Sequence, residues 1–597
     1  MRAVDIEVFQ NYFLVMGKDF DTGKVTVFEM YDGKPLDGKA VMAWLKADEN
    51  ITFNGSRFDL PILGQACAGK SCSELKALCN KIIVEEVPLF ALDIYAPTCK
   101  HIDLFDPAPG VGVSLKGYGA RMHMHHLQDL PIPHDALISP EQRKLLISYC
   151  ENDLDTTIAL YRAIEQQIAL RRAMSRQYGI DLRSKSDAQI AEAVICSEVV
   201  KETRQYPSKP GMGASRRFKY IPPDFISFQT APLQQMLEAV RGMTFNVLAN
   251  GSPKCDALDD YKVVIGETTY RMGVGGLHSC EKSVAHIADD EYVIVDRDVA
   301  SYYPAIILNC QLYPKHIGPE FLKVYRSIVQ RRLEAKTAAK VAKKAGNRAT
   351  ELAQTVIADS LKITINGSFG KFGSIHSRLY SPDLLIQTTV TGQLSLLMLI
   401  ELLESHGIRV VSANTDGIVI KCRHSQVQEM NDLIKLWEFF TGFETEETRY
   451  RALYAKDVNN YIAIKSDGVK TKGLYAEGSL KKHPFTAICT DAVIAYLTAH
   501  TPLEKTIVDC TDVSKFVGIR GVRGGGQYNG EMLGKVVRWY YSTASTGCIT
   551  SVANGNKVAK TDGAKPLMTL PDTVPDDIDY AWYVNEAKSI LKAIGVK

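Results

Sequence analysis

The sequence predicts a multidomain protein of the mixed α/β class, an α+β arrangement of several domains. Its 597 residues are too many for one hydrophobic core, so three to five domains or subdomains are expected. Hydrophobic residues make up 46% of the chain and charged residues 23%, without any low-complexity tract, which is typical of globular proteins. Segments with strand periodicity and segments with helical periodicity both occur along the chain, and together they indicate the α/β class.

The N-terminal part of the chain, from position 1 to about position 165, predicts one α/β domain. Residues 1–20 have the pattern of two strands around a polar break, and residues 51–63 predict a strand end that leads into a helix. Residues 141–172 have apolar side chains at i, i+3 and i+4, which predicts a long helix. The stretch from about 200 to 285 is punctuated by proline and glycine, and it predicts irregular connecting structure.

The second half predicts a buried strand, a helical hairpin and a long helix. Residues 291–308 predict a strand that ends in carboxylates and turns into a helix. Residues 321–345 predict a helix, Gly346 and Asn347 break it, and a second helix follows through about 366, which gives a protruding helical hairpin. Residues 384–405 predict a long amphipathic helix, and the C-terminal stretch 476–597 has a mixed pattern.

Charge and cysteine content limit the classes of ligand. The formal net charge is +2, so any nucleic-acid partner must be bound by local basic patches. The 13 cysteines are scattered as in reduced intracellular proteins. Cys67, Cys72 and Cys79 lack the paired spacing of a zinc knuckle, so zinc is the weaker interpretation there. The histidine-rich residues 122–126 are interpreted as a polar loop rather than a metal site.

The N-terminus lacks the pattern of a secretory signal, because Asp5 and Glu7 stand where an apolar core would be needed. The sequence has no apolar stretch of transmembrane length without a polar interruption. We therefore expect a soluble, cytoplasmic protein with no membrane partner.

Residues 411–420 (VSANTDGIVI) predict a β-hairpin with Asp416 at its tip. Hydrophobic and β-branched residues flank Asn414, Asp416 and Gly417, which are residue types that tolerate the positive φ of a tight turn. Asp416 is therefore either a plain turn residue or a carboxylate held on a rigid tip for chemistry. The hairpin alone does not decide between these interpretations.

The first domain has carboxylates at spacings that bring them together. Asp5 and Glu7 point the same way on a strand, Tyr149 and Asp153 share one face of a helix, and Asp59 lies where a loop enters a helix. Four carboxylates from three elements suit two divalent cations, which can activate water and neutralise the leaving oxygen of a phosphodiester. Each of these three residue patterns alone is common on protein surfaces. All three together, in this order along the chain, are a much more specific signal for a two-metal site.

The second half has its own carboxylate pair. Asp298 follows a hydrophobic strand, and together with Asp416 it gives two carboxylates on adjacent strands of one sheet. This arrangement again suits a two-metal phosphoryl transfer.

The predicted helical hairpin is strongly basic. Residues 323–348 contain nine lysines and arginines against one acid, and a solvated basic face is the alternative interpretation. Helical i, i+4 spacing places Arg332 beside Lys336 and Lys362 beside Asn366. Three cations that face a carboxylate pair could clamp a triphosphate.

Six motifs, in order between residue 5 and about residue 475, resemble those of family B DNA polymerases. Three resemble the polymerase motifs D-x2-S-L-Y-P, K-x3-N-S-x-Y-G and D-T-D-S: DVASYYP (298–304), KITINGSFGKF (362–372) and ANTDG (413–417). Three resemble the motifs of the proofreading 3′→5′ exonuclease: Asp5/Glu7, Asn54/Phe58/Asp59 and Tyr149/Asp153. The short chain is most similar to the polymerases of bacteriophages and other mobile elements.

The resemblance implies a ribonuclease-H-like exonuclease followed by palm, fingers and thumb. The expected boundaries are 1–165 for the exonuclease, 166–289 for a connecting region and N-terminal palm extension, 290–320 and 373–475 for the palm, 321–372 for the fingers and 476–597 for the thumb.

The resemblance also implies roles for individual residues. Two Mg²⁺ per site, replaceable by Mn²⁺, are expected on Asp298 and Asp416, and on Asp5, Glu7, Asp59 and Asp153, with Tyr149 orienting a water. Nucleotide binding is expected from Arg332, Lys336, Lys362, Asn366 and Tyr303. DNA binding is expected from Asn54, Phe58, Ser114, Leu115, Lys456, Tyr461, Lys470 and Lys472.

The chain departs from the family pattern at several positions. Asn414 stands where D-T-D-S has its first aspartate, and Gly367 and Phe369 replace the serine and tyrosine of the lysine motif. Tyr302 replaces the usual leucine, which leaves Tyr303 as the tyrosine beneath the incoming sugar.

Two insertions of protein-primed family members have no room here. The interval from Asp298 to Lys362 and the interval from Asn366 to Asp416 are used up by the predicted helices and hairpin. Neither leaves enough chain for a further folded element. The expected partners are primer-template DNA and dNTPs without a terminal protein, and a single-strand-binding protein, a helicase or a primase of the same replication system are candidates.

Two alternatives stay open at this point. One is a stand-alone exonuclease whose polymerase half only binds DNA, which Asn414 makes conceivable. The other is a non-enzymatic DNA-binding relic, against which the retained carboxylate positions argue.

Overall fold

The computed structural model describes residues 1–130, 132–210, 217–259 and 261–596. They form two compact units, and the mixed α/β class predicted from the sequence is confirmed. The first unit contains Met1–Ser175, Gly179–Ser186 and Glu477–Ala587, and the second contains Arg176–Tyr178, Asp187–Ala476 and Lys588–Lys597. The finer domain boundaries expected from the resemblance stay a prediction.

The N-terminal part of the first unit is built on a five-stranded sheet of order β3-β2-β1-β4-β5. The first three strands are antiparallel, and β1 pairs in parallel with β4, as β4 does with β5. Their bounds are β1 (Arg2–Val8), β2 (Tyr12–Asp19), β3 (Val25–Tyr31), β4 (Asn50–Thr52) and β5 (His101–Asp103). The two strands predicted in residues 1–20 are confirmed as β1 and β2.

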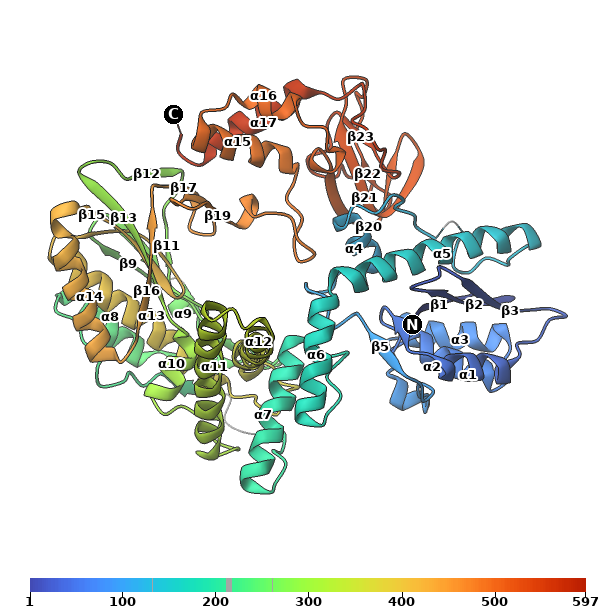
Figure 1. The fold of residues 1–597 in the computed structure, drawn as a ribbon, viewed down its shortest axis with the longest axis horizontal. Coiled ribbons are helices and arrows are strands. Elements are labelled where there is room, and N and C mark those ends of the chain that lie inside the picture. The colour runs from blue at the N-terminus through green and yellow to red at the C-terminus, as the bar shows by residue number, and fades with distance from the viewer. Residues whose placement is uncertain (131, 211–216, 260, 597) are drawn as a thin grey trace. The chain divides into compact units, whose positions relative to one another are not determined.

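Helices cover both faces of this sheet (Figure 1). Helices α1 (Gly38–Ala47), α2 (Asp59–Cys67) and α3 (Cys72–Ile83) pack on one face in a core with Ile6, Phe13 and Val15. Helix α5 (Pro140–Ala163) packs on the other face, and the short α4 (Leu115–Arg121) contacts α5. The single helix predicted over 141–172 is wrong in one detail, because α5 ends and α6 (Glu165–Tyr178) begins at Ile164.

The C-terminal part of the first unit contains a four-stranded sheet of order β22-β20-β21-β23 and three helices. The bounds are α15 (Ala487–Ala499), α16 (Leu503–Val508), β20 (Gly518–Tyr528), β21 (Glu531–Tyr541), β22 (Thr550–Ser551), β23 (Ala564–Pro566) and α17 (Tyr580–Ala593). This part docks on the N-terminal part through the histidine-rich loop 122–126. Buried Arg538 donates hydrogen bonds to the carbonyls of Met124 (2.9 Å) and His125 (3.1 Å).

The second unit is centred on a seven-stranded sheet of order β16-β13-β15-β14-β11-β10-β9. The strands are β9 (Lys262–Ile265), β10 (Thr268–Arg271), β11 (His278–Ser279), β13 (Tyr292–Val299), β14 (Arg409–Asn414), β15 (Gly417–Arg423) and β16 (Thr445–Tyr450). Helices α10 (Tyr302–Asn309), α13 (Pro382–Ser405) and α14 (Val427–Thr441) contribute to its core. A second sheet has the order β12 (Val284–Ile287), β17 (Ala452–Asp457), β18 (Asn460–Ile464) and β19 (Val469–Lys472).

The prediction of irregular structure over 200–285 is wrong for much of that stretch. It contains helix α8 (Ala231–Gly242), a short α9 (Asp256–Asp259) and the strands β9 to β11 of the main sheet. Another small sheet joins β6 (Arg217–Lys219), β7 (Thr244–Val247) and β8 (Pro253–Lys254). Residues 211–216, which belong to the predicted Pro- and Gly-rich connection, lie outside the described residues.

The predicted helical hairpin is confirmed as α11 (Glu320–Lys344) and α12 (Arg348–Phe372), which lie side by side (Figure 1). Gly346, with φ of 69°, makes the turn between them. Helix α7 (Asp187–Thr203) packs against α12 so closely that a Cβ on Gly367 would lie 2.6 Å from the Asp187 carbonyl oxygen. The glycine that replaces the family's serine therefore permits this helix contact.

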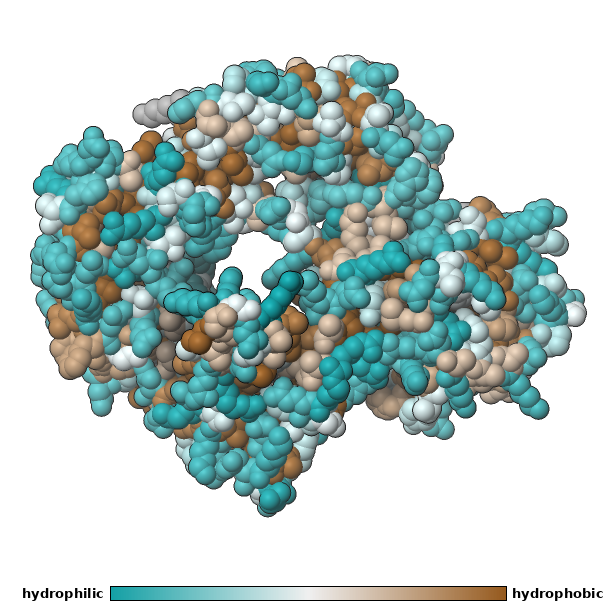
Figure 2. Space-filling model, viewed as in Figure 1, coloured by the Kyte–Doolittle hydropathy of each residue, from teal (hydrophilic) through white to brown (hydrophobic). Residues whose placement is uncertain are grey.

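Helix α13 is, within the described part of the chain, the one helix long and apolar enough to cross a membrane. Of its apolar window, 78% is buried inside the protein, which is typical of a core helix. On the face shown in Figure 2, hydrophobic residues form separate patches among hydrophilic ones.

Candidate active sites

Four carboxylates of the first unit converge as predicted. Strand β1 contributes Asp5 and Glu7, and α5 contributes Asp153, whose carboxylate oxygens all lie within 4.8 Å of one another. Asp59, the first residue of α2, lies close enough to Asp5 for the two carboxyl groups to shift each other's pKa. Three elements far apart in sequence thus build one carboxylate cluster, named here the excision site after the exonuclease role that the sequence resemblance leads us to expect.

The electrostatics of the excision site fit divalent cations. Burial raises the pKa of Asp153 to about 7 and also raises the pKa of Asp5. The pKa values of Glu7 and Asp59 are raised more strongly, because neighbouring carboxylates add to the effect of burial. Several buried carboxylates at such short separation need positive charge among them. A set of hard oxygen donors suits Mg²⁺ or Mn²⁺, so the residues present fit the expected metal.

A lysine that the sequence did not single out also belongs to this site. The Lys116 ammonium donates to the Tyr149 hydroxyl and lies 3.1 Å from the Asp129 carboxylate. Asp129 in turn accepts a hydrogen bond from the backbone N–H of Lys535, in the C-terminal part of the unit, at 3.0 Å. Burial raises the pKa of Tyr149, so its hydroxyl stays protonated and able to donate.

The four residues of the first unit that are expected to bind DNA have positions in the fold that can be described. The Ser114 hydroxyl caps α4 by accepting from the Gly117 N–H at 3.1 Å, and Leu115 packs against the core beneath α5. Phe58 occupies the N-cap of α2 and packs against the core on the other side of the sheet. Asn54 has a left-handed backbone, with φ of 67°. Contacts of these four residues to DNA stay a prediction.

The second unit brings Asp298 and Asp416 into one cavity of about 230 Å³, called here the palm site. Asp298 lies near the end of β13, and Asp416 lies at the tip between β14 and β15. The Val299 N–H donates to the Asp416 carbonyl at 2.7 Å, which fixes the tip beside β13. A Cβ on Gly417 would lie 2.2 Å from Asp298 Oδ1, so this position needs glycine.

Two lysines and two further carboxylates, Asp296 and Glu281, line the palm site. Lys470 Nζ lies 3.0 Å from Asp296 Oδ2 and 3.8 Å from Asp298 Oδ2, and it donates to the Tyr450 hydroxyl at 3.1 Å. Burial and then Asp296 raise the pKa of Asp298 to about 6, whereas Lys470 opposes the shift. Lys472 also lines the cavity.

The residues of the second unit that are expected to bind DNA differ in whether they line the palm site. Tyr461 lines the palm site with both lysines, whereas Lys456 is exposed and is not among the residues that line the cavity. Lys470, expected on duplex phosphates, is held by Asp296 and Tyr450 instead of projecting from a free hairpin. Their contacts to DNA stay predictions.

The basic helical hairpin contacts the region where β13 ends, beside Asp298. Arg332 donates to the Ser301 hydroxyl at 3.2 Å, and Ser301 belongs to the DVASYYP motif. Lys336 Nζ lies 3.9 Å from Glu446, which pairs with Asp298 across β13 and β16. Lys362 and Asn366 are exposed one turn apart on α12. Arg332 thus contacts the DVASYYP motif, whereas Lys336 and Glu446 form an exposed ion pair of the kind that is common on a solvated surface.

The two adjacent tyrosines of the motif have different surroundings. Tyr302 is buried and donates to the Gly392 carbonyl at 2.6 Å. Tyr303 is half-buried, and its ring stacks on Phe369 of α12 at a centroid distance of 4.3 Å. Tyr303 is thus the tyrosine whose ring joins the palm motif to the lysine motif.

No protein-family model and no curated protein matches this chain. Among solved structures, the chain is similar to the family B DNA polymerase from the hyperthermophilic archaeon Pyrobaculum calidifontis. The match covers 100% of this chain and 77% of that chain, at 15% sequence identity and a TM-score of 0.41. A likeness at this level carries no functional conclusion, so function has to be inferred from the residues of the two sites.

Lys116, Asp296 and Glu281 are charged site residues that the sequence motifs missed. Asp296 shares a strand face with Asp298 at i, i+2, so this spacing was a usable signal. Lys116 directly follows Leu115 and has no comparable spacing to Tyr149, because their contact joins α4 to α5.

Proposed function

We propose that the chain is a template-directed DNA polymerase that extends a nucleic-acid primer with dNTPs and carries a 3′→5′ proofreading exonuclease. The observation that supports this proposal most strongly is the palm site. There, Asp298 and Asp416 line one cavity, and Arg332 and Lys336 of the helical hairpin approach the same strand end.

In this proposal each palm-site residue has a physical task. Two divalent cations held by Asp298 and Asp416 would help deprotonate the primer 3′ hydroxyl and neutralise the departing pyrophosphate. Arg332, Lys336 and Lys362 bind the triphosphate, and Asn366 supports the nascent pair. Lys472 and Tyr461 hold the primer end, and Tyr303 lies beneath the sugar.

The excision site would use its carboxylates in the same way on a phosphodiester. Asp5, Glu7, Asp59 and Asp153 hold the divalent cations, and the Tyr149 hydroxyl orients the attacking water. The Lys116 ammonium holds that hydroxyl in place and reduces the net negative charge of the pocket.

The biological setting follows from the same proposal. We infer a compact polymerase of the bacteriophage or mobile-element type, acting in the host cytoplasm on primer-template DNA. It extends an ordinary primer without a terminal protein, and a single-strand-binding protein, helicase or primase of the same system are candidate partners.

A primer-extension gel with labelled primer, with and without dNTPs, tests the proposal. Asp298→Asn or Asp416→Asn should lower extension by at least about 100-fold, because each removes a charged metal ligand from the reaction centre, while degradation of single strands persists. Asp5→Ala with Glu7→Ala should do the reverse.

The same gel separates the alternatives. A stand-alone exonuclease would degrade the primer but never extend it, and a non-enzymatic DNA-binding protein would do neither. Extension by Asp416→Asn at the wild-type rate would show that the palm site is assigned to the wrong carboxylates.

A further inference from the structure

The turn that leads into α2 carries Asn54 and Phe58, both expected to bind DNA, and its backbone is unusual. Asn54 is left-handed, with φ of 67°, which costs an L-residue about 1 kcal/mol. The next residue, Gly55, has no room for a side chain, since a Cβ would lie 2.2 Å from Thr52 Oγ1. Phe58, at the N-cap of α2, makes no side-chain capping bond. The conformation of this turn must therefore be stabilised by hydrogen bonds to another part of the chain.

Asp103 accepts these hydrogen bonds. It is the last residue of β5 and is only 6% exposed. Its carboxylate accepts backbone N–H groups from Asn54 (2.7 Å) and Phe105 (3.0 Å) at Oδ1 and from Ser56 (2.9 Å) at Oδ2. A buried carboxylate with amide donors on both oxygens holds those amides in a fixed arrangement.

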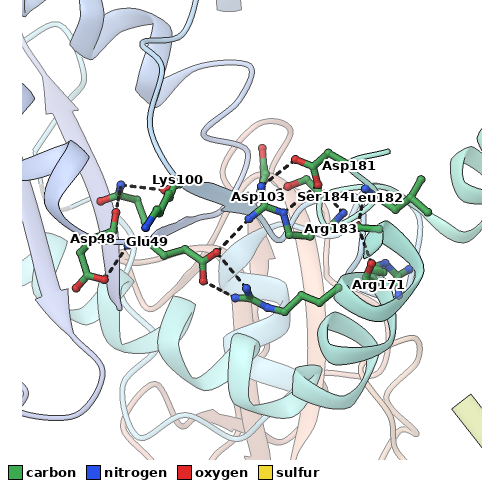
Figure 3. Close-up of polar contacts among 12 residues, drawn as sticks. Asp48, Glu49, Lys100, Asp103, Arg171, Asp181, Leu182, Arg183 and Ser184 are labelled. Atoms are coloured by element: carbon green, nitrogen blue, oxygen red, sulfur yellow. Dashed lines mark hydrogen bonds and ion pairs between the residues drawn. The ribbon is translucent and has the colours of Figure 1, made fainter. Parts of the chain in front are cut away.

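The backbone of Asp103 is itself fixed. Its N–H donates to the Ser184 hydroxyl at 2.9 Å, as Figure 3 shows. The segment around Ser184 is held by Arg183, which lies 3.1 Å from Glu49, and by Arg171, which donates to the Lys185 carbonyl at 2.9 Å. Asp103 thus joins the turn to a firmly held stretch of chain after α6.

We propose that Asp103 is a positioning residue of the excision site, which sets the place of Asn54 and Asp59 through the intervening turn. Asp59 begins α2 shortly after Asn54, is 6% exposed, and must meet Asp5 to complete the carboxylate set. Displacement of a catalytic group by about 1 Å can cost about 100-fold in rate, so an anchor at this turn matters for chemistry. This inference rests on the proposed excision activity.

Asp103→Asn tests the inference with almost no change in size. The asparagine oxygen can still accept from Asn54 and Phe105, whereas its NH2 group would face the Ser56 N–H. We expect degradation of single-stranded DNA to slow at least about tenfold. Primer extension, which belongs to the other unit, should be unchanged. Ser184→Ala should give a smaller loss of the same kind, and Asp32→Asn, an exposed acid of the same unit, should give none.

Metal binding gives a readout independent of activity. In a full chain that also carries Asp298→Asn and Asp416→Asn, the rise in melting temperature with Mn²⁺ should report on the excision site. Asp103→Asn should raise the Mn²⁺ concentration for half of that rise severalfold. A normal Mn²⁺ response together with a lower metal-free melting temperature would show a purely structural role and overturn the inference, as would wild-type degradation.

The outcome also separates this inference from the proposed function. If wild-type protein degrades no DNA, the proposed excision activity fails. If wild-type protein degrades DNA and Asp103→Asn does so equally well, only the positioning role fails.

Discussion

Asn414 holds the tip of the hairpin that carries Asp416. Its side-chain amide donates to the Val458 carbonyl at 2.9 Å and to the Asn459 side chain at 3.3 Å, which ties the tip to the turn between β17 and β18. A carboxylate has no hydrogen to donate and would repel that carbonyl. The asparagine that departs from the D-T-D-S pattern therefore has a structural role beside Asp416, because it holds the hairpin tip in place.

Asn414→Asp should keep an active polymerase but lower its stability. Losing the two donated bonds should cost about 1 kcal/mol of unfolding free energy, while Asp416 and Asp298 stay in place. Thermal unfolding and a primer-extension rate measure the two effects. Asn347→Asp is the matched control, since Asn347 caps α12 as an acceptor and aspartate caps equally well. An unchanged melting temperature in Asn414→Asp would contradict the structural role of the Asn414 side chain.

Tyr303→Val should admit ribonucleotides. Exclusion of a 2′ hydroxyl by the ring is steric, so shrinking the side chain should raise GTP incorporation relative to dGTP by roughly 10- to 200-fold. Single-nucleotide extension with each substrate measures the ratio. Tyr302→Phe removes only the bond to the Gly392 carbonyl, and it should leave the ratio unchanged. A changed ratio in Tyr302→Phe alone would move the sugar contact to Tyr302.

At the scale of elements, long helices with apolar periodicity could be predicted from the sequence, whereas short β-strands that pair with distant strands could not. Helices α5, α11, α12 and α13 have clear apolar periodicity, and the β14–β15 hairpin has a turn signal. Strands β9 to β11 are very short, and β11 pairs with β14, which lies far away in the sequence. Their structure depends on partners that a local pattern cannot reveal, so this region was predicted as irregular.

The loop 122–126 and the start of the C-terminal part meet through two histidines. The Nε2 atoms of His123 and His483 lie 3.2 Å apart, and burial lowers the pKa of both, to about 4 for His483. In the unfolded chain a histidine has a pKa of about 6.5. Between about pH 6.5 and 4 the unfolded chain thus binds protons that the folded protein does not, so stability falls as pH falls through this window.

His483→Gln should reduce the pH dependence of folding stability, because it removes one of the two buried histidines of the His123–His483 contact. Melting temperatures measured from pH 8 to pH 4 should fall less steeply below about pH 6.5 than in the wild type. The exposed His500→Gln is the control and should keep the wild-type profile. Parallel profiles for wild type and His483→Gln would contradict the assignment.

At the scale of the whole molecule, the two intervals between the motifs of the proposed polymerase are fully occupied by the elements already described. The stretch from Asp298 to Lys362 is used by α10, α11 and part of α12, and the stretch from Asn366 to Asp416 by the rest of α12, α13 and β14. Neither stretch has room for a further folded subdomain that could grip a terminal protein or close around DNA.

A polymerase without such a ring should hold DNA mainly through phosphate contacts. We expect extension from an ordinary primer, no protein–nucleotide adduct, and processivity that falls steeply with salt. Single-hit extension on primed circular single-stranded DNA at about 50 and about 200 mM salt should show product lengths falling at least about tenfold. Kilobase products that displace a blocking strand at both salt concentrations would contradict this expectation.

Part of the excision site was predictable because i, i+2 and i, i+4 spacings fix which side chains share a face. Asp5 with Glu7, and Tyr149 with Asp153, follow that rule. Asp103 and Lys116 do not, since Asn54, Ser56 and Tyr149 lie on other elements and meet them only when whole elements pack. Residues that support a site are therefore harder to find from sequence than residues that form it.

The first unit is assembled from the two ends of the chain, and this has a consequence during translation. A nascent chain that has emerged as far as position 476 would contain the whole carboxylate pocket, but the carbonyls of Met124 and His125 would still await Arg538. Synthesis of the remaining segment takes on the order of 10 seconds at ribosomal rates. The largely continuous second unit can fold in that interval. The first unit should therefore be the last part of a newly made molecule to reach its final packing, because it has to wait for residues 477–587.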